Sequence, residues 1–226
     1  MQQIQIGKLT SSMARAKEER ALVLIVDDDA RIREALHELM LSAGMQAACF
    51  ASTRELLDAE VLDQPGCLIL DVRMPGTSGL DLQHHLVTGG NPKPIIFLTG
   101  HGDIPMTVQA MKSGAVDFLI KPVRDQTLLD AVSTAIERDL AQRACARVTE
   151  RTLELWETLT PREREVFQEV ARGRVNKQIA YDLGISIVTV KLHRGKVMRK
   201  MQAASIGELF RAWESIPAEM RTTSAA

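Results

Sequence analysis

The sequence is poor in cysteine and in long apolar runs, and both shortages limit what the chain can be. Its three cysteines, Cys49, Cys67 and Cys145, lie far apart with no C-x-x-C pair, so we expect neither a disulfide framework nor a zinc site. No run of eighteen or more apolar residues occurs, and the first twenty residues contain no apolar stretch long enough for a signal peptide. We therefore expect a cytoplasmic protein with no membrane segment.

The chain also has almost no net charge, but this balance hides an asymmetry. The formal net charge is −1, yet residues 1–157 carry 16 Lys+Arg against 22 Asp+Glu, whereas residues 158–226 carry 12 against 7. An acidic first part is thus joined to a basic second part. This distribution predicts that only the second part meets a polyanion.

Glycine and proline are absent between Pro122 and Pro161. Apolar residues recur there every four positions from Leu128 to Val148, as is typical of a helix. The last helix of the first domain is predicted to continue as a connector, which over about 30 residues would span roughly 45 Å. A break near Arg147 to Arg151, where the apolar stripe weakens, is an equally open alternative.

Short apolar runs alternate with amphipathic segments from Ala21 onward. This order predicts an α/β doubly wound, five-stranded parallel sheet, followed by a long helical linker and an all-α domain of four helices that contains a helix-turn-helix. The predicted domains are a poorly ordered extension at 1–20, the α/β domain at 21–138, the linker at 139–157, the helical domain at 158–215 and a frayed tail at 216–226. The predicted strands are 21–27, 46–50, 67–71, 94–99 and 117–120, and the predicted helices are 30–43, 53–61, 79–88, 105–113, 161–172, 176–183, 187–201 and 206–215.

Several predicted strands end in residues that can hold a phosphoryl group. The first ends in Asp27-Asp28-Asp29, the third in Asp71 and the fourth in Thr99, while Lys121 follows the fifth. Functional groups of such sheets collect beyond the carboxyl ends of the strands, and oxygen ligands alone favour a hard cation such as Mg²⁺. Taken singly, each of these residues has an ordinary structural explanation. Asp29, for example, suits a helix N-cap. Together they predict an aspartyl phosphate at Asp71.

Four segments, "VLIVDDD", "CLILDVRMPG", "FLTGHGD" and "MKSGAVDFLIKP", resemble the receiver domain of two-component response regulators, which has a CheY-like, flavodoxin-like fold. The resemblance implies that a sensor histidine kinase phosphorylates Asp71. It also implies that Mg²⁺ is held by Asp27, Asp28, Asp71 and the backbone carbonyl of Arg73, and that Thr99 and Lys121 bind the phosphoryl oxygens. Thr99 and Phe118 would form the switch, although Phe118 also suits a plain core aromatic.

The basic part carries helix-turn-helix spacing. Asn176 to Leu183 form a predicted helix, Gly184 a turn, and Ser186 the N-cap of a basic helix. The stretch from "LTPREREVF" to "KVMRKM" resembles the LuxR-type helix-turn-helix, and the whole chain resembles the FixJ/NarL family, in its FixJ- and StyR-like branch. Candidate DNA contacts are Lys191 and Leu192 at base edges and Thr189, His193, Arg194 and Lys196 at phosphates, with His193 equally suited to packing. Gly195 replaces a side chain that relatives can use to read a base.

The expected function is a transcriptional regulator that dimerises on phosphorylation and binds double-stranded promoter DNA, with RNA polymerase as a further candidate partner. It is not expected to be an enzyme. A phosphatase or phosphotransferase is a rival because Asp27-x-Asp29 is similar to the motif of aspartate-nucleophile hydrolases, but nothing in the chain resembles a substrate cap. The other alternative is a regulator that uses the receiver only for dimerisation, without phosphate.

Overall fold

The computed structural model describes residues 21–91, 93–100 and 102–221. The predicted extension at residues 1–20 therefore lies outside the described residues. The strands are β1 (Leu22–Val26), β2 (Gln46–Phe50), β3 (Gly66–Leu70), β4 (Ile95–Thr99) and β5 (Asp117–Ile120). The helices are α2 (Ala30–Ser42), α3 (Thr53–Asp58), α4 (Gly79–Thr88), α5 (Ile104–Lys112), α6 (Asp125–Glu157), α7 (Pro161–Ala171), α8 (Asn176–Asp182), α9 (Ile187–Lys200), α10 (Ile206–Ser215) and α11 (Ala218–Arg221).

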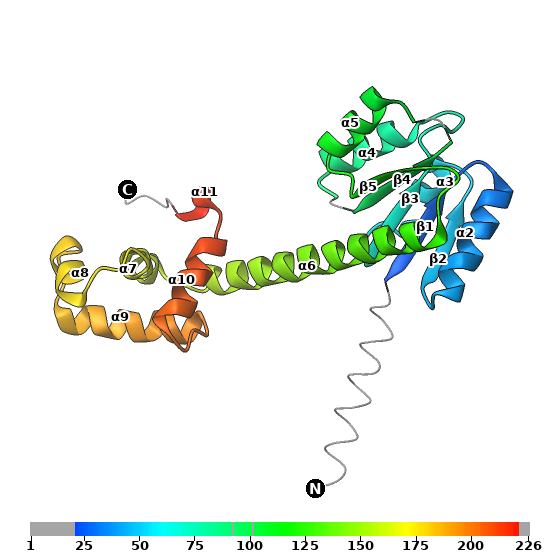
Figure 1. Ribbon diagram of the computed structural model, residues 1–226. Coiled ribbons are helices and arrows are strands. Elements are labelled where there is room, and N and C mark those ends of the chain that lie inside the picture. The colour runs from blue at the N-terminus through cyan, green and yellow to red at the C-terminus, as the bar shows by residue number, and fades with distance from the viewer. Residues whose placement is uncertain (1–20, 92, 101, 222–226) are drawn as a thin grey trace, which may run out of the picture. The chain divides into compact units, whose positions relative to one another are not determined.

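The five strands form one parallel sheet in the order β2-β1-β3-β4-β5, with helices on both faces (Figure 1). The alternating side chains of the strands pack into two separate cores. One core joins Leu24, Leu68 and Phe97 to helices α3, α4 and α5, and the other joins Ile25 and Ile96 to α2 and the start of α6. The predicted doubly wound sheet is confirmed, and all five strands expose their carboxyl ends at the same edge.

Helix α6 is a single helix of 33 residues, without the break that the sequence left open. Its first half packs on the sheet through Leu128, Val132 and Ala135, which are fully or almost fully buried. Further along, Asp139 is 1% exposed and accepts a hydrogen bond from the Gly66 N–H at 2.8 Å. The side chain of Asp139 thereby ties this part of α6 to the beginning of β3.

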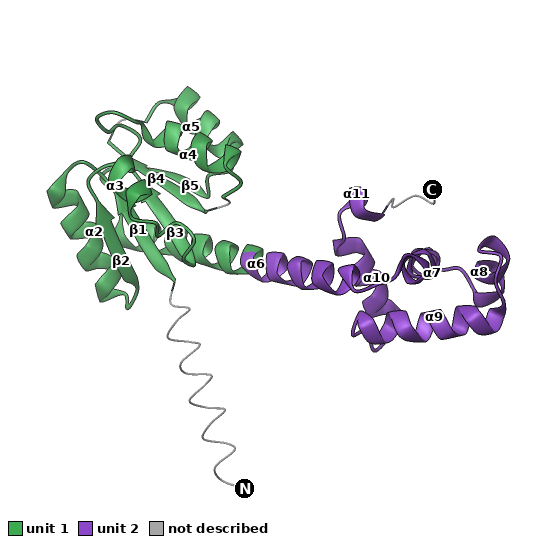
Figure 2. Ribbon diagram, turned by 180° about the vertical axis from the view of Figure 1, so that it is seen from behind, with its two compact units in different colours: residues 1–142 green, residues 143–226 purple. Residues whose placement is uncertain are grey.

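The chain divides into two compact units, residues 1–142 and 143–226, which Figure 2 shows in different colours. The second unit is built from helices around an aromatic cluster of Trp156, Phe167 and Trp213, whose ring centroids lie 5.4 to 5.9 Å apart. The last turns of α6 belong to this cluster, because Trp156 is 2% exposed. A capping box begins α7, with Thr160 and Glu163 each accepting from the other's backbone N–H.

The predicted frayed tail is wrong for its first residues. Ile216 is fully buried in the core of the second unit, and residues 218–221 form the short helix α11. The Arg221 side chain lies over the Trp213 ring at 5.6 Å and donates to the carbonyls of Glu214 and Ile216. These contacts hold residues 216–221 against the rest of the second unit, whereas the sequence predicted a frayed tail there.

Candidate functional sites

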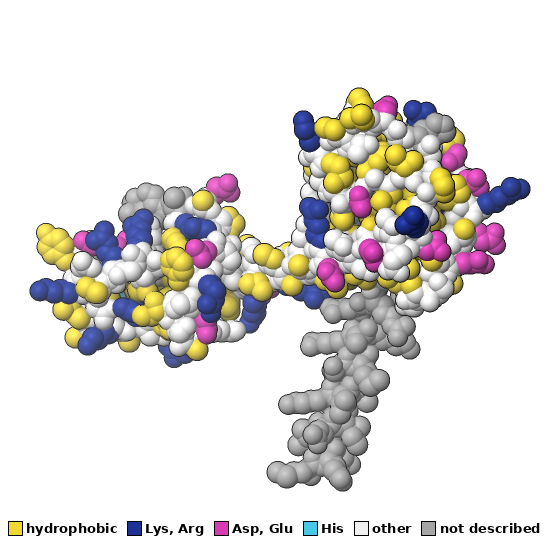
Figure 3. All heavy atoms as spheres, viewed as in Figure 1, with side chains coloured by type: hydrophobic (Ala, Val, Ile, Leu, Met, Phe, Trp, Pro, Cys, Tyr) yellow, Lys and Arg dark blue, Asp and Glu magenta, His cyan; other side chains and the backbone are white. Residues whose placement is uncertain are grey.

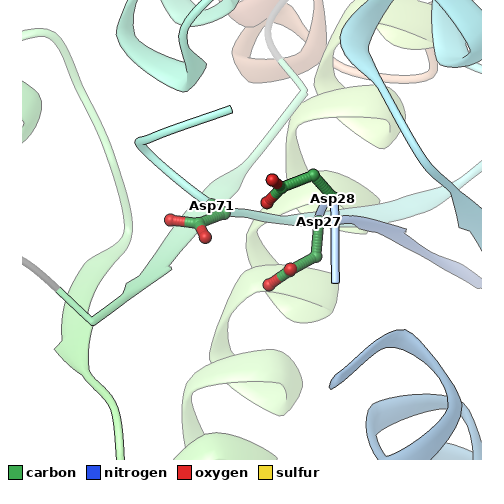
Figure 4. Close-up of side chains that lie close together, drawn as sticks. All are labelled: Asp27, Asp28 and Asp71. Carbon is green, nitrogen blue, oxygen red and sulfur yellow. The ribbon is translucent and has the colours of Figure 1, made fainter. Parts of the chain in front are cut away.

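Three carboxylates from two neighbouring strands meet at the carboxyl edge of the sheet. Val26 pairs with Leu70 in the register of β1 and β3, and the Asp71 N–H donates to the Val26 carbonyl at 2.9 Å. Asp27 and Asp28 therefore lie beside Asp71, as Figure 4 shows. Each of the three offers a carboxylate oxygen within 4.8 Å of the other two.

Lys121 provides the positive charge of this acidic cluster, which we define as Asp27, Asp28 and Asp71. Its ammonium donates to Asp27 Oδ2 at 2.5 Å and to Asp71 Oδ2 at 3.2 Å. Burial raises the pKa of Asp27, while the hydrogen bonds from Lys121 and from the Asp29 N–H act in the opposite direction. The site thus holds several anionic groups in a small volume with one fixed cation.

The acidic cluster fits a small hard cation. Its donors are oxygens without histidine or cysteine, which is the set that Mg²⁺ prefers. One oxygen from each of the three carboxylates lies within 4.8 Å of the other two, so the three groups are close enough to share one ion. Arg73, the predicted carbonyl ligand, lies beside Asp71, and its N–H donates to Asp71 Oδ1 at 3.2 Å.

The predicted switch residues lie on β4 and β5, the two strands that follow β3 in the sheet. Thr99 ends β4 and is 1% exposed, and its carbonyl accepts from the Lys121 N–H at 2.9 Å. Phe118 is half-buried on β5 and packs against Phe97 with a centroid distance of 5.8 Å. A side-chain Cβ at Gly102 would lie 2.9 Å from the Phe118 ring, so the loop after β4 contacts the ring closely.

Helices α8 and α9 form the predicted helix-turn-helix. Gly184 adopts a φ of +63° in the turn, and Ser186 caps α9 by accepting from the Thr189 N–H. Ile179 and Val190 are fully buried between the helices. Arg194 of α9 donates to the Asn176 side chain at 2.6 Å, which joins the beginning of α8 to the middle of α9.

The predicted DNA-contact residues of α9 differ in exposure. Lys191 and Leu192 are exposed, Leu192 by 57%. Thr189, His193, Arg194 and Lys196 are half-buried. Thr189 shares a hydrogen bond with Ser186, and Nδ1 of His193 is buried without a hydrogen-bond partner among the described residues. The two residues predicted to reach base edges are thus more accessible than those predicted to touch phosphates.

Ion pairs in the second unit leave the cations of α9 largely without carboxylate partners. The four carboxylates of α7 and α8 pair with Arg162, Arg172, Arg174 and Lys200. Helix α9 contains no Asp or Glu, and within the described part of the chain Lys191, Lys196 and Arg199 form no ion pair. Figure 3 shows Lys and Arg side chains over the visible face of this unit, consistent with a polyanion as its ligand.

Comparison with known proteins assigns both halves of the chain. Residues 23–133 match the response regulator receiver domain, and residues 157–212 match the bacterial regulatory proteins of the luxR family. The chain is 51% identical to Nodulation protein W of Bradyrhizobium diazoefficiens over 87% of each chain. The chain belongs to the two-component response regulators.

Other relatives of this response regulator agree. The response regulator protein TodT of Pseudomonas putida is 44% identical over 91% of each chain, and the transcriptional regulatory protein FixJ of Azorhizobium caulinodans is 43% identical over 84% of this chain and 90% of its own. The solved structure of the response regulator StyR matches with a TM-score of 0.76 at 43% identity, covering 86% of this chain and 98% of its own. The predicted family and its FixJ- and StyR-like branch are confirmed, and the family comprises transcriptional regulators rather than enzymes.

Sequence reasoning misjudged one residue of this response regulator and overlooked two. The basic helix predicted after Ser186 includes Lys200, but its ammonium contacts Glu163 and the Thr158 carbonyl instead of facing a polyanion. Arg33 was overlooked, although it donates to the Asp27 carbonyl at 2.6 Å and so supports the acidic cluster. Val188 was also overlooked, although it is 77% exposed on α9.

None of the described helices is both long and apolar enough to cross a bilayer.

Proposed function

We propose that this response regulator is phosphorylated on Asp71 by a sensor histidine kinase and that the phosphoryl group controls DNA binding by α9. The observation that carries the proposal is that Asp71 shares one site with Asp27, Asp28 and the Lys121 ammonium. Ordinary N-caps and turns do not require such a convergence of charges.

The chain's own residues account for phosphoryl transfer at this site. An oxygen of the Asp71 carboxylate forms the new bond to phosphorus while the bond to the kinase histidine breaks and the imidazole leaves. The Asp71 side chain is 11% exposed, so it is not completely closed off from solvent. The Lys121 ammonium and the Thr99 hydroxyl would bind the transferred oxygens.

Asp27, Asp28, Asp71 and the Arg73 carbonyl would hold Mg²⁺. When bound, the ion neutralises the negative charge that gathers around the phosphoryl oxygens. The oxygen-only donor set and its narrow spread support this assignment. Arg33 would orient the backbone on which Asp27 and Asp28 lie.

Phosphorylation would act on the face formed by α5 and β5. Thr99 and Phe118 would move toward the phosphoryl group, and the neighbouring α5 would shift with them. This face exposes Ile104, Val108, Met111 and Ile120 by 81%, 44%, 42% and 56%. Exposed apolar residues gathered on adjacent elements suit a protein interface, and we propose that two phosphorylated copies pair there.

The dimer would place two copies of α9 on paired half-sites of promoter DNA. Lys191 and Leu192 would reach base edges, and Thr189, His193 and Lys196 would lie near phosphates. Arg194 is the weakest of these candidates because its guanidinium is already engaged by Asn176. Contact with RNA polymerase remains a prediction without a surface assigned to it.

Mass spectrometry tests the phosphorylation site. Incubation with acetyl phosphate and Mg²⁺ should add one phosphoryl group to the wild-type protein and none to Asp71→Asn. The matched control is Asp58→Asn, because the Asp58 side chain is 74% exposed and remote from the acidic cluster in sequence. Phosphorylation of Asp71→Asn to the same extent would refute the assignment, and steady turnover of phosphoesters would favour the phosphatase rival.

A further inference from the structure

The outward side of α9 carries an apolar stripe that we define as Val188, Leu192 and Gly195. We propose that Val188 and Leu192 contact thymine methyl groups in the major groove, so that this protein reads its half-site partly by apolar contact. The inference rests on the proposed function, because it requires that α9 bind DNA. The inference adds Val188 to the candidate specificity-determining residues, and it predicts that the operator presents thymine methyl groups to α9.

The position of the stripe follows from the helix period. Val190 and Val197 are 0% and 1% exposed and therefore mark the side of α9 that faces the core. Val188 and Leu192 are one turn apart and are 77% and 57% exposed, so they project from the other side. Gly195 continues this side, and a Cβ built there would meet no atom within 4 Å.

Exposed apolar residues alone do not identify a partner, because isolated ones are common on protein surfaces. The charges around the stripe provide the second argument. Lys191 lies beside it, Lys196 and Arg199 lie on the same helix, and none of the three has a carboxylate partner among the described residues. A face that combines apolar side chains with unpaired cations suits a groove lined by phosphates better than an apolar protein surface.

The chemistry of the stripe then selects the feature that is read. In the major groove the C5 methyl of thymine is the apolar group, whereas the other base edges present hydrogen-bond donors or acceptors. Valine and leucine side chains cannot satisfy those donors and acceptors, so contact with a polar edge would leave them unpaired. Lys191 is the one residue among positions 188, 191, 192 and 195 whose side chain can donate, which suits a guanine edge.

The spacing along α9 predicts how far apart the two methyl groups lie. Four residues at 1.5 Å per residue separate Val188 from Leu192 by about 6 Å along the helix axis. Base pairs are about 3.4 Å apart and the helix axis is inclined to the DNA axis in the groove, so the two thymines should lie no more than about two base steps from each other, on either strand. Gly195, having no side chain, would let the backbone approach the groove next to them.

Methyl removal tests the inference directly. A preferred duplex is first selected from random DNA with the full-length, acetyl phosphate-treated protein. Each thymidine of one half-site is then replaced in turn by deoxyuridine, which removes only the methyl group, and binding is measured for the wild type, Val188→Ala and Leu192→Ala. The matched control is Ile206→Ala, which truncates an apolar side chain that is 55% exposed on α10.

We expect two positions at which deoxyuridine weakens wild-type binding roughly fourfold, as the loss of about one buried methylene-sized group implies. Val188→Ala should abolish the effect at one position and Leu192→Ala at the other, while Ile206→Ala preserves both. Methyl effects that are absent from the wild type, or that persist unchanged in both variants, would overturn the inference. A wild-type protein that selects no duplex at all would instead refute the proposed function.

Discussion

At the scale of single residues, Lys121 compensates the repulsion among the carboxylates of the acidic cluster. Its side chain is 17% exposed and contacts both Asp27 and Asp71. Replacement by methionine would keep much of the volume but leave the carboxylates without their cation. We expect Lys121→Met to lower the free energy of unfolding of the first unit by about 2 to 4 kcal/mol in a chelator-containing buffer.

Mg²⁺ should recover part of this loss, so its stabilising effect should be larger in Lys121→Met than in the wild type. Chemical denaturation followed by far-UV circular dichroism, with and without Mg²⁺, measures both effects. Lys112→Met, at the exposed end of α5, is the control and should change neither value. Equal stability of Lys121→Met and the wild type in chelator would contradict the role given to this lysine.

Replacement of Gly195 should affect the stability of α9 and its DNA binding in opposite directions. Glycine within a helix costs about 1 kcal/mol relative to alanine, and a Cβ at this position meets no neighbouring atom. We expect Gly195→Ala to stabilise the second unit by up to about 1 kcal/mol while weakening its binding to the selected duplex. Thermal unfolding and DNA titration of the same preparation measure both, and tighter DNA binding by the variant would contradict close backbone approach.

At the scale of elements, the second unit depends on the contact between the N-terminus of α7 and the C-terminal turn of α9. Glu163 is 3% exposed, closes the capping box of α7 and pairs with Lys200 at 2.6 Å. Burial raises the pKa of Glu163, but the hydrogen bonds from Lys200 and Thr160 outweigh it, and the net pKa is lowered from 4.5. The charged form of Glu163 therefore stabilises the folded unit.

This arrangement predicts a pH dependence with a defined sign. Because the folded pKa lies below the unfolded one, the contribution of Glu163 is complete above pH 4.5 and is lost as the pH falls through the lower folded value. Glu163→Gln should lower the stability of the second unit by about 1 to 2 kcal/mol at neutral pH, with the difference shrinking in acid.

The fluorescence of Trp156 and Trp213 reports this unfolding selectively, since both tryptophans of the chain lie in the second unit. The control variant is Glu214→Gln, which changes an equivalent charge on α10 where only the backbone carbonyl has a described contact. A stability difference between Glu163→Gln and the wild type that grows toward acid would contradict the assignment.

The elements also show which parts of the structure could be predicted from sequence. The strands could be predicted from apolar runs and the start of α9 from its capping residue Ser186, because both signals are local. The predicted helix at 53–61 ends instead at Asp58, since Glu60 adopts a positive φ of 52°. Nothing in the local pattern separates a continuous α6 from a broken one, because long exposed helices tolerate weak periodicity.

In the candidate sites, too, some features could be predicted from the sequence and others depend on tertiary packing. The acidic cluster could be predicted because carboxyl ends of parallel strands share one edge of the sheet. The inward contact of Lys200 could not, because it depends on how α9 lies against α7, and a helical pattern does not specify its neighbour. Val188 was missed because an exposed valine looks in sequence like any other helix residue.

At the scale of the whole molecule, the charge asymmetry and the apolar face of α5 and β5 belong to different binding events. The acidic first part should not bind DNA by itself, and under the proposed function regulation would act through association of two copies. Ile104→Glu would place a carboxylate on the proposed interface, where pairing two copies would bring like charges together. We expect this variant to accept phosphate at Asp71 but to remain monomeric.

Light scattering after size-exclusion chromatography, with and without acetyl phosphate, measures the mass of each variant. Leu41→Glu is the matched control because Leu41 is 53% exposed on α2, which packs on the opposite face of the sheet. The control should dimerise like the wild type. Phosphate-dependent dimerisation of Ile104→Glu would show that the interface lies elsewhere.

Under the proposed function, the charge on Asp71 controls the DNA affinity of α9. The most direct measurement is the dissociation constant of the full-length protein for its selected duplex, with and without acetyl phosphate and Mg²⁺, for the wild type and Asp71→Asn. We predict that treatment tightens wild-type binding by about tenfold or more, the effect of a coupling free energy of about 1.4 kcal/mol or more, and leaves Asp71→Asn unchanged. Equal affinity of the treated and untreated wild type, or an equal response of Asp71→Asn, would contradict it.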